Sequence, residues 1–360
     1  MHQAFLRRGL SAAAVAAAAV LASCSTPEPA PAPLPPPPPP PPSLTLNQSV
    51  AEAASVYLAF VRQVSTMQPG GFQNAEAIQA ELRKGAASEA GQLSRGVIAY
   101  GSILALQSPE YVSGVRQFAA DPAQRQQMVA RIIADPAYAA TLPGADNAAG
   151  LIAAAMGADA IALTAIAEAI ESDAYTIQER HDPRRRWAVQ PVADRIGRLE
   201  GAKTLSVAQL PSAEESARLF AAAHSGTGLN LSPAQRGAPF TPAMVNSLAI
   251  AALAVLGAAG DDARANTDAL TSDADNDFCF SMSKLMLFQC LAAAKPSYED
   301  MFCVGRHVVR DLAGCTQHYT GPMPTISVAA PATTASATPT PMAAEAASSG
   351  SNAAATTAGG

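Results

Sequence analysis

The sequence predicts an all-α protein, a multi-helix bundle of about ten helices with a C-terminal, disulfide-stapled antiparallel helical hairpin. Much of the 49% hydrophobic fraction is alanine, the best helix former. Aromatic residues make up only 5% of the chain and β-branched runs are few, which argues against a β fold. Capping side chains recur directly before proline, a pattern typical of helix starts.

The N-terminus carries a short basic segment with Arg7 and Arg8, and then an apolar run that ends in Leu-Ala-Ser-Cys at 21–24. The run is too short to cross about 30 Å of hydrocarbon as a retained helix, so residues 1–23 are predicted to be a signal peptide. Its ending resembles the lipobox of bacterial lipoproteins. The resemblance implies cleavage before Cys24, acylation of that cysteine and attachment to a membrane by acyl chains. An ordinary secretory leader is the alternative.

By the same resemblance, Ser25 in place of aspartate favours the outer membrane over retention in the inner membrane. Residues 24–43 are predicted to be the acylated cysteine followed by a proline-rich spacer. Eight consecutive prolines favour a polyproline II rod of about 3.1 Å per residue, which would hold the next domain away from the lipid. A solvated linker of no selected length and a ligand for proline-binding domains are the alternatives.

Residues 44–320 are predicted to form the helical domain, with a possible subdomain boundary in the glycine-containing loop 225–240. Residues 321–360, rich in Ala, Thr, Pro and Ser, are predicted to be a disordered tail because they lack large apolar groups. The net charge of −6 argues against nucleic acid as the main partner and against a polybasic attachment to anionic lipid.

Helix starts are marked in order along this domain. Ser49 with Glu52 forms a capping-box pattern before residues spaced for one apolar face. Ser212 with Glu215, and Ser297 with Asp300, repeat this pairing of cap and acid. The other starts share a capping side chain directly before proline: Ser108, Asp121, Asp135, Asp182 and Thr241.

Two segments, 148–170 and 244–259, are apolar on nearly all sides and are predicted to be central helices of a soluble bundle. A membrane span is the alternative for the first segment, and the second is too short for one. The first also carries small residues at intervals of four, which would let a neighbouring backbone approach closely: Gly150, Ala154, Ala158 and Ala162.

Four cysteines remain after Cys24, an even number that predicts two disulfides in an exported protein: Cys279, Cys290, Cys303 and Cys315. Pro296-Ser297 separates two helical stretches, about 277–294 and 298–313, and predicts an antiparallel hairpin. Facing residues of such a hairpin have a nearly constant index sum.

The nested pairs, Cys279 with Cys315 and Cys290 with Cys303, have index sums of 594 and 593 and are therefore predicted. Cysteines eleven residues apart on one helix lie about 16 Å apart, too far for a disulfide. The crossed pairing would need parallel helices. The competing interpretation is a zinc site of reduced cysteines with His307, but no cysteine pair has the two-residue spacing common in such sites.

The candidate binding surface has two parts. Arg184, Arg185 and Arg186 with the only tryptophan, Trp187, could hold phosphate or carboxylate on lipid A, peptidoglycan or a protein. A solvated loop with Trp187 packed on the core is the alternative. The second part, on the hairpin, consists of the following residues: Arg306, His307 and Arg310.

His307 and Asp311 share a helical face, so the carboxylate could orient the imidazole for acid–base chemistry. A structural hydrogen bond is the alternative, because no serine or cysteine nucleophile is identifiable beside them. No catalytic residue, metal or cofactor is therefore assigned.

These observations predict an envelope lipoprotein that acts as a structural or assembly component, with an envelope protein or peptidoglycan as its partner. One alternative is a carrier of an apolar ligand inside the bundle, which a large dry pocket between 148–170 and 244–259 would favour. A second alternative is an envelope hydrolase with an unidentified site. No family is recognised for the helical domain.

Overall fold

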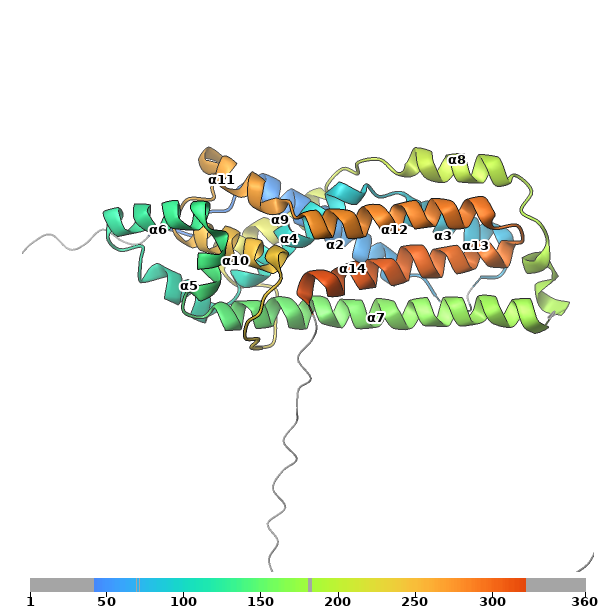
Figure 1. The fold of residues 1–360 in the computed structure, drawn as a ribbon, viewed down its shortest axis with the longest axis horizontal. Coiled ribbons are helices and arrows are strands. Elements are labelled where there is room, and N and C mark those ends of the chain that lie inside the picture. The colour runs from blue at the N-terminus through green and yellow to red at the C-terminus, as the bar shows by residue number, and fades with distance from the viewer. Residues whose placement is uncertain (1–41, 69, 71, 181–182, 322–360) are drawn as a thin grey trace, which may run out of the picture. The chain divides into compact units, whose positions relative to one another are not determined.

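The computed structural model describes residues 42–321 apart from 69, 71, 181 and 182. Over these residues the chain is helical and forms no strand, as the sequence predicts (Figure 1). The α-helices are α2 (Gln48–Ser65), α3 (Ala75–Ala86), α4 (Ala90–Ala105), α5 (Pro109–Arg116), α6 (Pro122–Ala134), α7 (Ala145–Arg180), α8 (Arg195–Leu205), α9 (Ala213–Ser225), α10 (Pro242–Val255), α11 (Ala265–Asp268), α12 (Ala274–Ala293), α13 (Ser297–Val304) and α14 (Asp311–Thr320).

Shorter helical turns join these helices: η1 (Pro136–Thr141), η2 (Pro183–Val189), η3 (Asp261–Ala263), η4 (Ala269–Thr271) and the π-helical η5 (Gly305–Arg310). The predicted signal peptide, the spacer up to residue 41 and the tail from residue 322 lie outside the described residues. The predictions made for those segments are therefore untested.

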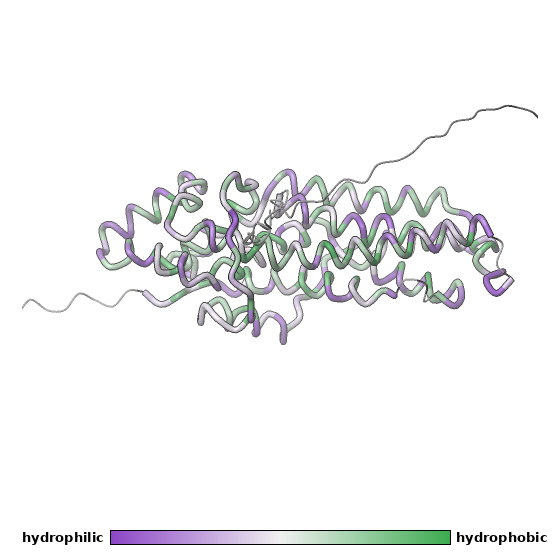
Figure 2. The backbone as a smooth tube through the Cα atoms, turned by 90° about the horizontal axis from the view of Figure 1, so that it is seen from below, coloured by the Kyte–Doolittle hydropathy of each residue, from purple (hydrophilic) through white to green (hydrophobic). Residues whose placement is uncertain are grey.

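Helix α10 is a central helix, as predicted for 244–259. Every residue from Ser247 to Val255 is fully buried. Small residues let its neighbours approach: a Cβ at Gly101 of α4 would lie 1.8 Å from the hydroxyl of Tyr319 in α14. That tyrosine hydroxyl lies 2.7 Å from Ser247 Oγ, which also donates to the carbonyl of Ile98 at 2.8 Å. Hydrophobic and hydrophilic stretches alternate along the long helices (Figure 2).

Helix α7 is not central, so the prediction for 148–170 is wrong in this respect. Residues 148–153 are buried on all sides, but from 154 onward only one face of α7 is buried, and Ile161 on the opposite face is 60% exposed. Gly150 alone of the small-residue stripe makes a close approach, since a Cβ there would lie 2.3 Å from the carbonyl oxygen of Ala234. The other three stripe residues are exposed, and alanine tolerates this because its side chain is small: Ala154, Ala158 and Ala162.

Among the described helices, α7 alone has the length and apolarity needed to cross a membrane, and half of its most apolar window is buried in the protein. The loop between α9 and α10 is present as predicted. Arg236 in this loop is buried, and it donates through its guanidinium to the carbonyl of Thr320 and through its amide to that of Asp146 at 2.9 Å. The subdomain boundary at 225–240 stays a prediction.

The predicted caps are confirmed at five starts, where the side chain accepts a hydrogen bond from a backbone N–H of the first turn: Ser108, Asp121, Asp135, Ser212 and Thr241. Asp182 lies outside the described residues. The prediction at Ser49 is wrong because Asn47 caps α2, and its amide is held by the carbonyl of Ala259 at 3.1 Å. Ser297 is also not a cap, since Pro296 precedes α13 and provides no side-chain bond.

The hairpin is confirmed, with Cys279 bonded to Cys315 and Cys290 to Cys303. Helices α12, α14 and α7 lie side by side (Figure 1). The return arm extends beyond the predicted 313 to Thr320 and contains η5 between the two disulfides. It has twelve steps between its cysteines where α12 has eleven. A π-helical turn takes up the extra residue, which keeps both pairs in register.

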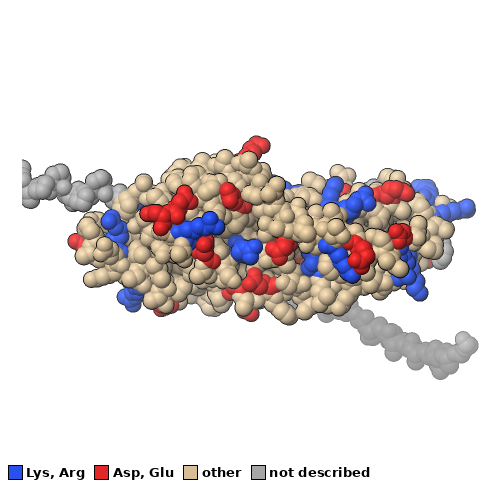
Figure 3. Space-filling model, turned by 90° about the horizontal axis from the view of Figure 1, so that it is seen from above, with Lys and Arg blue, Asp and Glu red and all other residues tan. Residues whose placement is uncertain are grey.

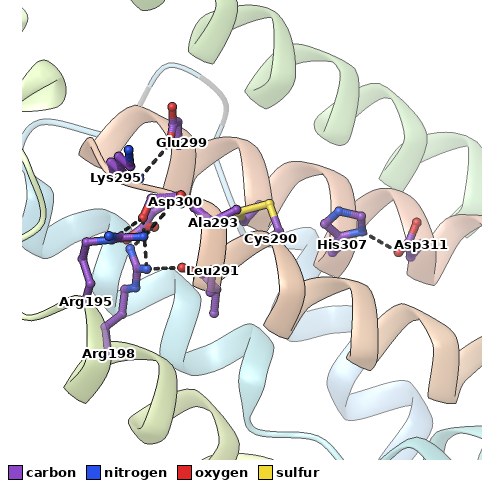
Figure 4. The surroundings of a disulfide bond; sticks show 12 residues. Arg195, Arg198, Cys290, Leu291, Ala293, Lys295, Glu299, Asp300, His307 and Asp311 are labelled. Atoms are coloured by element: carbon purple, nitrogen blue, oxygen red, sulfur yellow. Dashed lines mark hydrogen bonds and ion pairs between the residues drawn. A yellow bond between two sulfur atoms is a disulfide. The ribbon is translucent and has the colours of Figure 1, made fainter.

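A buried ion pair, which no local pattern predicts, fastens the turn of the hairpin to α8. The side chains of Arg198 and Asp300 are 4% and 0% exposed, and they form an ion pair. Gln79 of α3 donates to the same carboxylate at 2.6 Å. Burial raises the pKa of Asp300, and the hydrogen bonds from Arg198 and Gln79 oppose that effect. Arg195 adds bonds to backbone carbonyls at the end of α12 (Figure 4).

Candidate functional site

A groove of about 750 Å³ follows the hairpin beside the Cys279–Cys315 disulfide. Its apolar part comes from α12, through Phe278, Met282 and Met286. Both methionines are half-buried, whereas Phe278 is 65% exposed. The groove therefore offers an aromatic ring and two flexible thioethers on a covalently braced pair of helices.

The groove exists because α12 is apolar on two faces. Its inner face is buried in the bundle through Phe280, Leu287 and Leu291. Its outer face keeps Phe278 exposed, together with Leu285 at 46%. A surface helix of a globular protein normally turns one apolar stripe inward and polar residues outward. Contiguous exposed apolar residues of this kind are typical of interaction sites.

Polar side chains of the return arm line the same groove. His307 Nδ1 lies 3.1 Å from Asp311 Oδ2, so the predicted sharing of a helical face is confirmed (Figure 4). Arg306 is exposed beside them. This pairing orients the imidazole, and Arg306 adds a cation to the polar side of the groove.

Ser283 also lines the groove, and the sequence analysis did not identify it as a neighbour of His307. Its hydroxyl donates to the backbone carbonyl of His307 at 3.1 Å. Acyl-transfer triads instead bond the serine hydroxyl to the imidazole and place free backbone N–H groups at the reacting carbonyl. The contacts of Ser283, His307 and Asp311 thus support a structural role for the histidine pair.

Arg310 has a different role from the one predicted for it. Its guanidinium makes a two-pronged contact with Glu171 of α7, at 2.6 and 3.1 Å, and lies 3.7 Å from Glu168. These carboxylates raise the pKa of Arg310, with the hydrogen bond to Glu171 as the largest cause. Arg310 therefore fastens the hairpin to α7 and is not available to a ligand in the way that Arg306 is.

The basic cluster lies in η2, apart from the groove. Arg185 forms an ion pair with Asp173 of α7. Arg184 and Arg186 are exposed. Trp187 is half-buried, packs against the core and lines a second pocket beside α3. The structure therefore does not bring the two parts of the candidate surface into one site.

The zinc interpretation loses its sulfur ligands, because all four cysteines are in disulfides. Over the described ranges, no three His, Cys, Asp or Glu side chains are grouped closely enough to hold a metal ion. Acidic and basic side chains are interspersed on the face drawn in Figure 3, so that face offers no large area of one charge.

Lys284 is a second residue that the sequence analysis missed. It reaches from α12 to the α3–α4 junction, where its ammonium donates to the carbonyl of Ala86 at 3.0 Å and to Ser88 Oγ at 2.8 Å. Burial lowers the pKa of Lys284 to about 8. This contact positions the face of α12 opposite to the groove.

Comparison with known proteins identifies no relative of this chain: no family model, no curated protein and no solved structure matches it. The interpretation of its sites therefore rests on the geometry described above.

The lowered pKa of Lys284 predicts a pH-dependent stability. In the unfolded chain a lysine has a pKa of about 10.4, so from pH 8 to 9.5 the unfolded state binds more protons than the folded state. The free energy of unfolding should therefore rise with pH, by up to about 1.4 kcal/mol per unit. Urea unfolding should show this rise in the Cys24→Ala protein and not after the further change Lys284→Met.

The exposed lysine Lys203 supplies the matched control, and Lys203→Met should keep the rise. An equal rise with and without Lys284 would contradict this account of the buried ammonium.

Proposed function

We propose that the protein is a lipid-anchored component of the bacterial envelope, and two features support this. The Leu-Ala-Ser-Cys ending at 21–24 supports the anchor. The apolar groove over the Cys279–Cys315 disulfide supports a binding role for the helical domain. The proposal rests mainly on the groove, because α12 keeps apolar side chains on a face that the rest of the domain leaves uncovered.

The occupant of the groove is proposed to be another envelope protein. Protein interfaces combine an apolar centre, rich in aromatic residues and methionine, with a polar rim. Here Phe278 and Met282 form the apolar centre, while Asp275 and Arg306 provide rim charges of opposite sign. A groove along two antiparallel helices suits the apolar face of a third helix.

A carrier of an apolar ligand is the second candidate function. The region between 148–170 and 244–259, where such a ligand was first expected, is closely packed: Gly150 meets the backbone of Ala234, and residues 247–255 of α10 are fully buried. The same groove on the hairpin, with its two methionines, is the observation that favours a carrier. A hydrolase has less support, because Ser283 bonds a backbone carbonyl.

Replacing the acylated residue tests the anchor. Several acyl chains make membrane binding effectively permanent, and the mature protein has no anchor of this kind without Cys24. The Cys24→Ala protein should therefore appear in the soluble periplasmic fraction, whereas the unchanged protein should stay with membranes through an alkaline wash. Continued sedimentation of Cys24→Ala with washed membranes would refute acyl anchoring.

Changing the groove tests the binding role. A photoreactive residue placed at Leu285 should cross-link a partner protein in intact cells, and adding Phe278→Ser should weaken that cross-link about tenfold, as expected for an aromatic interface residue. Phe278 is mostly exposed, so the domain should stay folded. Leu210→Ser, at a site 93% exposed and outside the groove, is the control.

An equal cross-link in the Phe278→Ser and Leu210→Ser proteins would contradict the proposal. Recovery of a tightly bound apolar small molecule, with no cross-linked protein, would favour the carrier.

A further inference from the structure

A second pocket of about 500 Å³ lies beside α3, where it is independent of the hairpin groove. One wall is α3, which contributes Glu76 and Arg83. The facing wall is the segment 190–194, and the half-buried Trp187 lines the pocket between the same elements. The basic cluster at 184–186 directly precedes Trp187 in the chain. The pocket itself is lined by carboxylate and amide side chains as well as by arginine.

The wall at 190–194 is held in place by backbone contacts. Val192 N–H donates to the carbonyl of Lys295 at 2.8 Å, and Ser297 N–H donates to the carbonyl of Gln190 at 3.2 Å. Residues 295 and 297 form the turn of the hairpin, which the Cys290–Cys303 disulfide closes. The wall is therefore fixed to the most constrained part of the chain, and the pocket is pre-formed.

One lining residue of the pocket is a buried arginine with an unpaired N–H group. Arg198 lines the pocket, and its side chain is 4% exposed and paired with Asp300. Its buried Nε–H has no acceptor in the described part of the chain. Because almost none of this nitrogen's surface is open to solvent, it adds to the polarity of the pocket wall and does not itself contact a ligand.

The walls also carry polar side chains without a partner. Over the described residues, no hydrogen bond or ion pair engages the side chains of Glu76, Arg83 or Gln190. Asn74 uses its carbonyl oxygen to cap α3, which leaves its amide hydrogens available. Donors and acceptors of several kinds thus line the same pocket as the indole ring of Trp187.

This combination of one indole ring with both donors and acceptors argues against two classes of ligand. A polyphosphate would be repelled by Glu76, and an apolar ligand would leave the polar walls unpaired. A sugar ring has an apolar C–H face that suits an indole and a rim of hydroxyls that both donate and accept. We infer that this pocket binds an oligosaccharide, with Trp187 against a ring face, Glu76 and Gln190 on hydroxyls, and Arg83 on a carboxylate or carbonyl oxygen of the glycan.

The single tryptophan of the chain makes the test direct, because its fluorescence reports on this pocket alone. The folded Cys24→Ala protein is titrated with two probes, an N-acetylglucosamine trimer and a galacturonic acid trimer. At least one should change the emission of Trp187 saturably, with one site by calorimetry. No response to either trimer at millimolar concentration would overturn the inference, as would a response only to phosphatidylglycerol vesicles.

Variants locate the binding. Arg83→Gln and Gln190→Ala change exposed side chains and should each weaken the trimer about tenfold, since each removes a hydrogen bond to the sugar. Arg116→Gln, at an exposed position of α5 outside the pocket, is the matched control and should bind as the unchanged protein does. Phe278→Ser should also bind normally, which separates this site from the groove. Equal binding by Arg83→Gln, Gln190→Ala and Arg116→Gln would overturn the assignment.

Discussion

The nested disulfides are the constraint on which the rest of this structure depends. They join α12 to its return arm at two points, so the hairpin does not rely on burial of a single apolar stripe. By loop-closure entropy each bridge contributes about 3 kcal/mol or more. This covalent support explains how α12 can bury Phe280 and Leu287 and still leave Phe278 and Leu285 exposed. The groove follows from that arrangement.

Polar contacts then join the braced hairpin to the other helices. Asp300 holds Arg198 of α8 and Gln79 of α3, Lys284 holds the α3–α4 junction, and Arg310 holds Glu171 of α7. Breaking a buried pair such as Arg198–Asp300 would leave an uncompensated buried charge. These contacts therefore favour one arrangement of the helices over others. The groove lies along the outer side of the hairpin, and the second pocket lies beside its turn. Both candidate sites therefore use the same rigid element.

Local signals made much of the fold predictable. Capping side chains before proline identified helix starts at Ser108 and Thr241, and the index sums identified the cysteine pairs. The Arg198–Asp300 pair was not predictable, because its members lie 102 residues apart and the local pattern around Asp300 pointed to a cap with Ser297 instead. The groove did leave a signal: α12 carries apolar residues at Phe278, Met282 and Leu285 in addition to those of its buried face. Of the predicted surface, Arg306 and His307 line the groove, whereas Arg185 and Arg310 are held in ion pairs.

The most direct measurement is a map of cysteine linkages in the protein purified from cells with thiols blocked throughout. Digestion without reductant, followed by mass spectrometry, should give one peptide pair joining Cys279 to Cys315 and another joining Cys290 to Cys303. Free thiols at these positions, bound zinc, or a link between Cys279 and Cys290 would contradict the account, because the groove and the wall of the second pocket would then lose the brace that holds them.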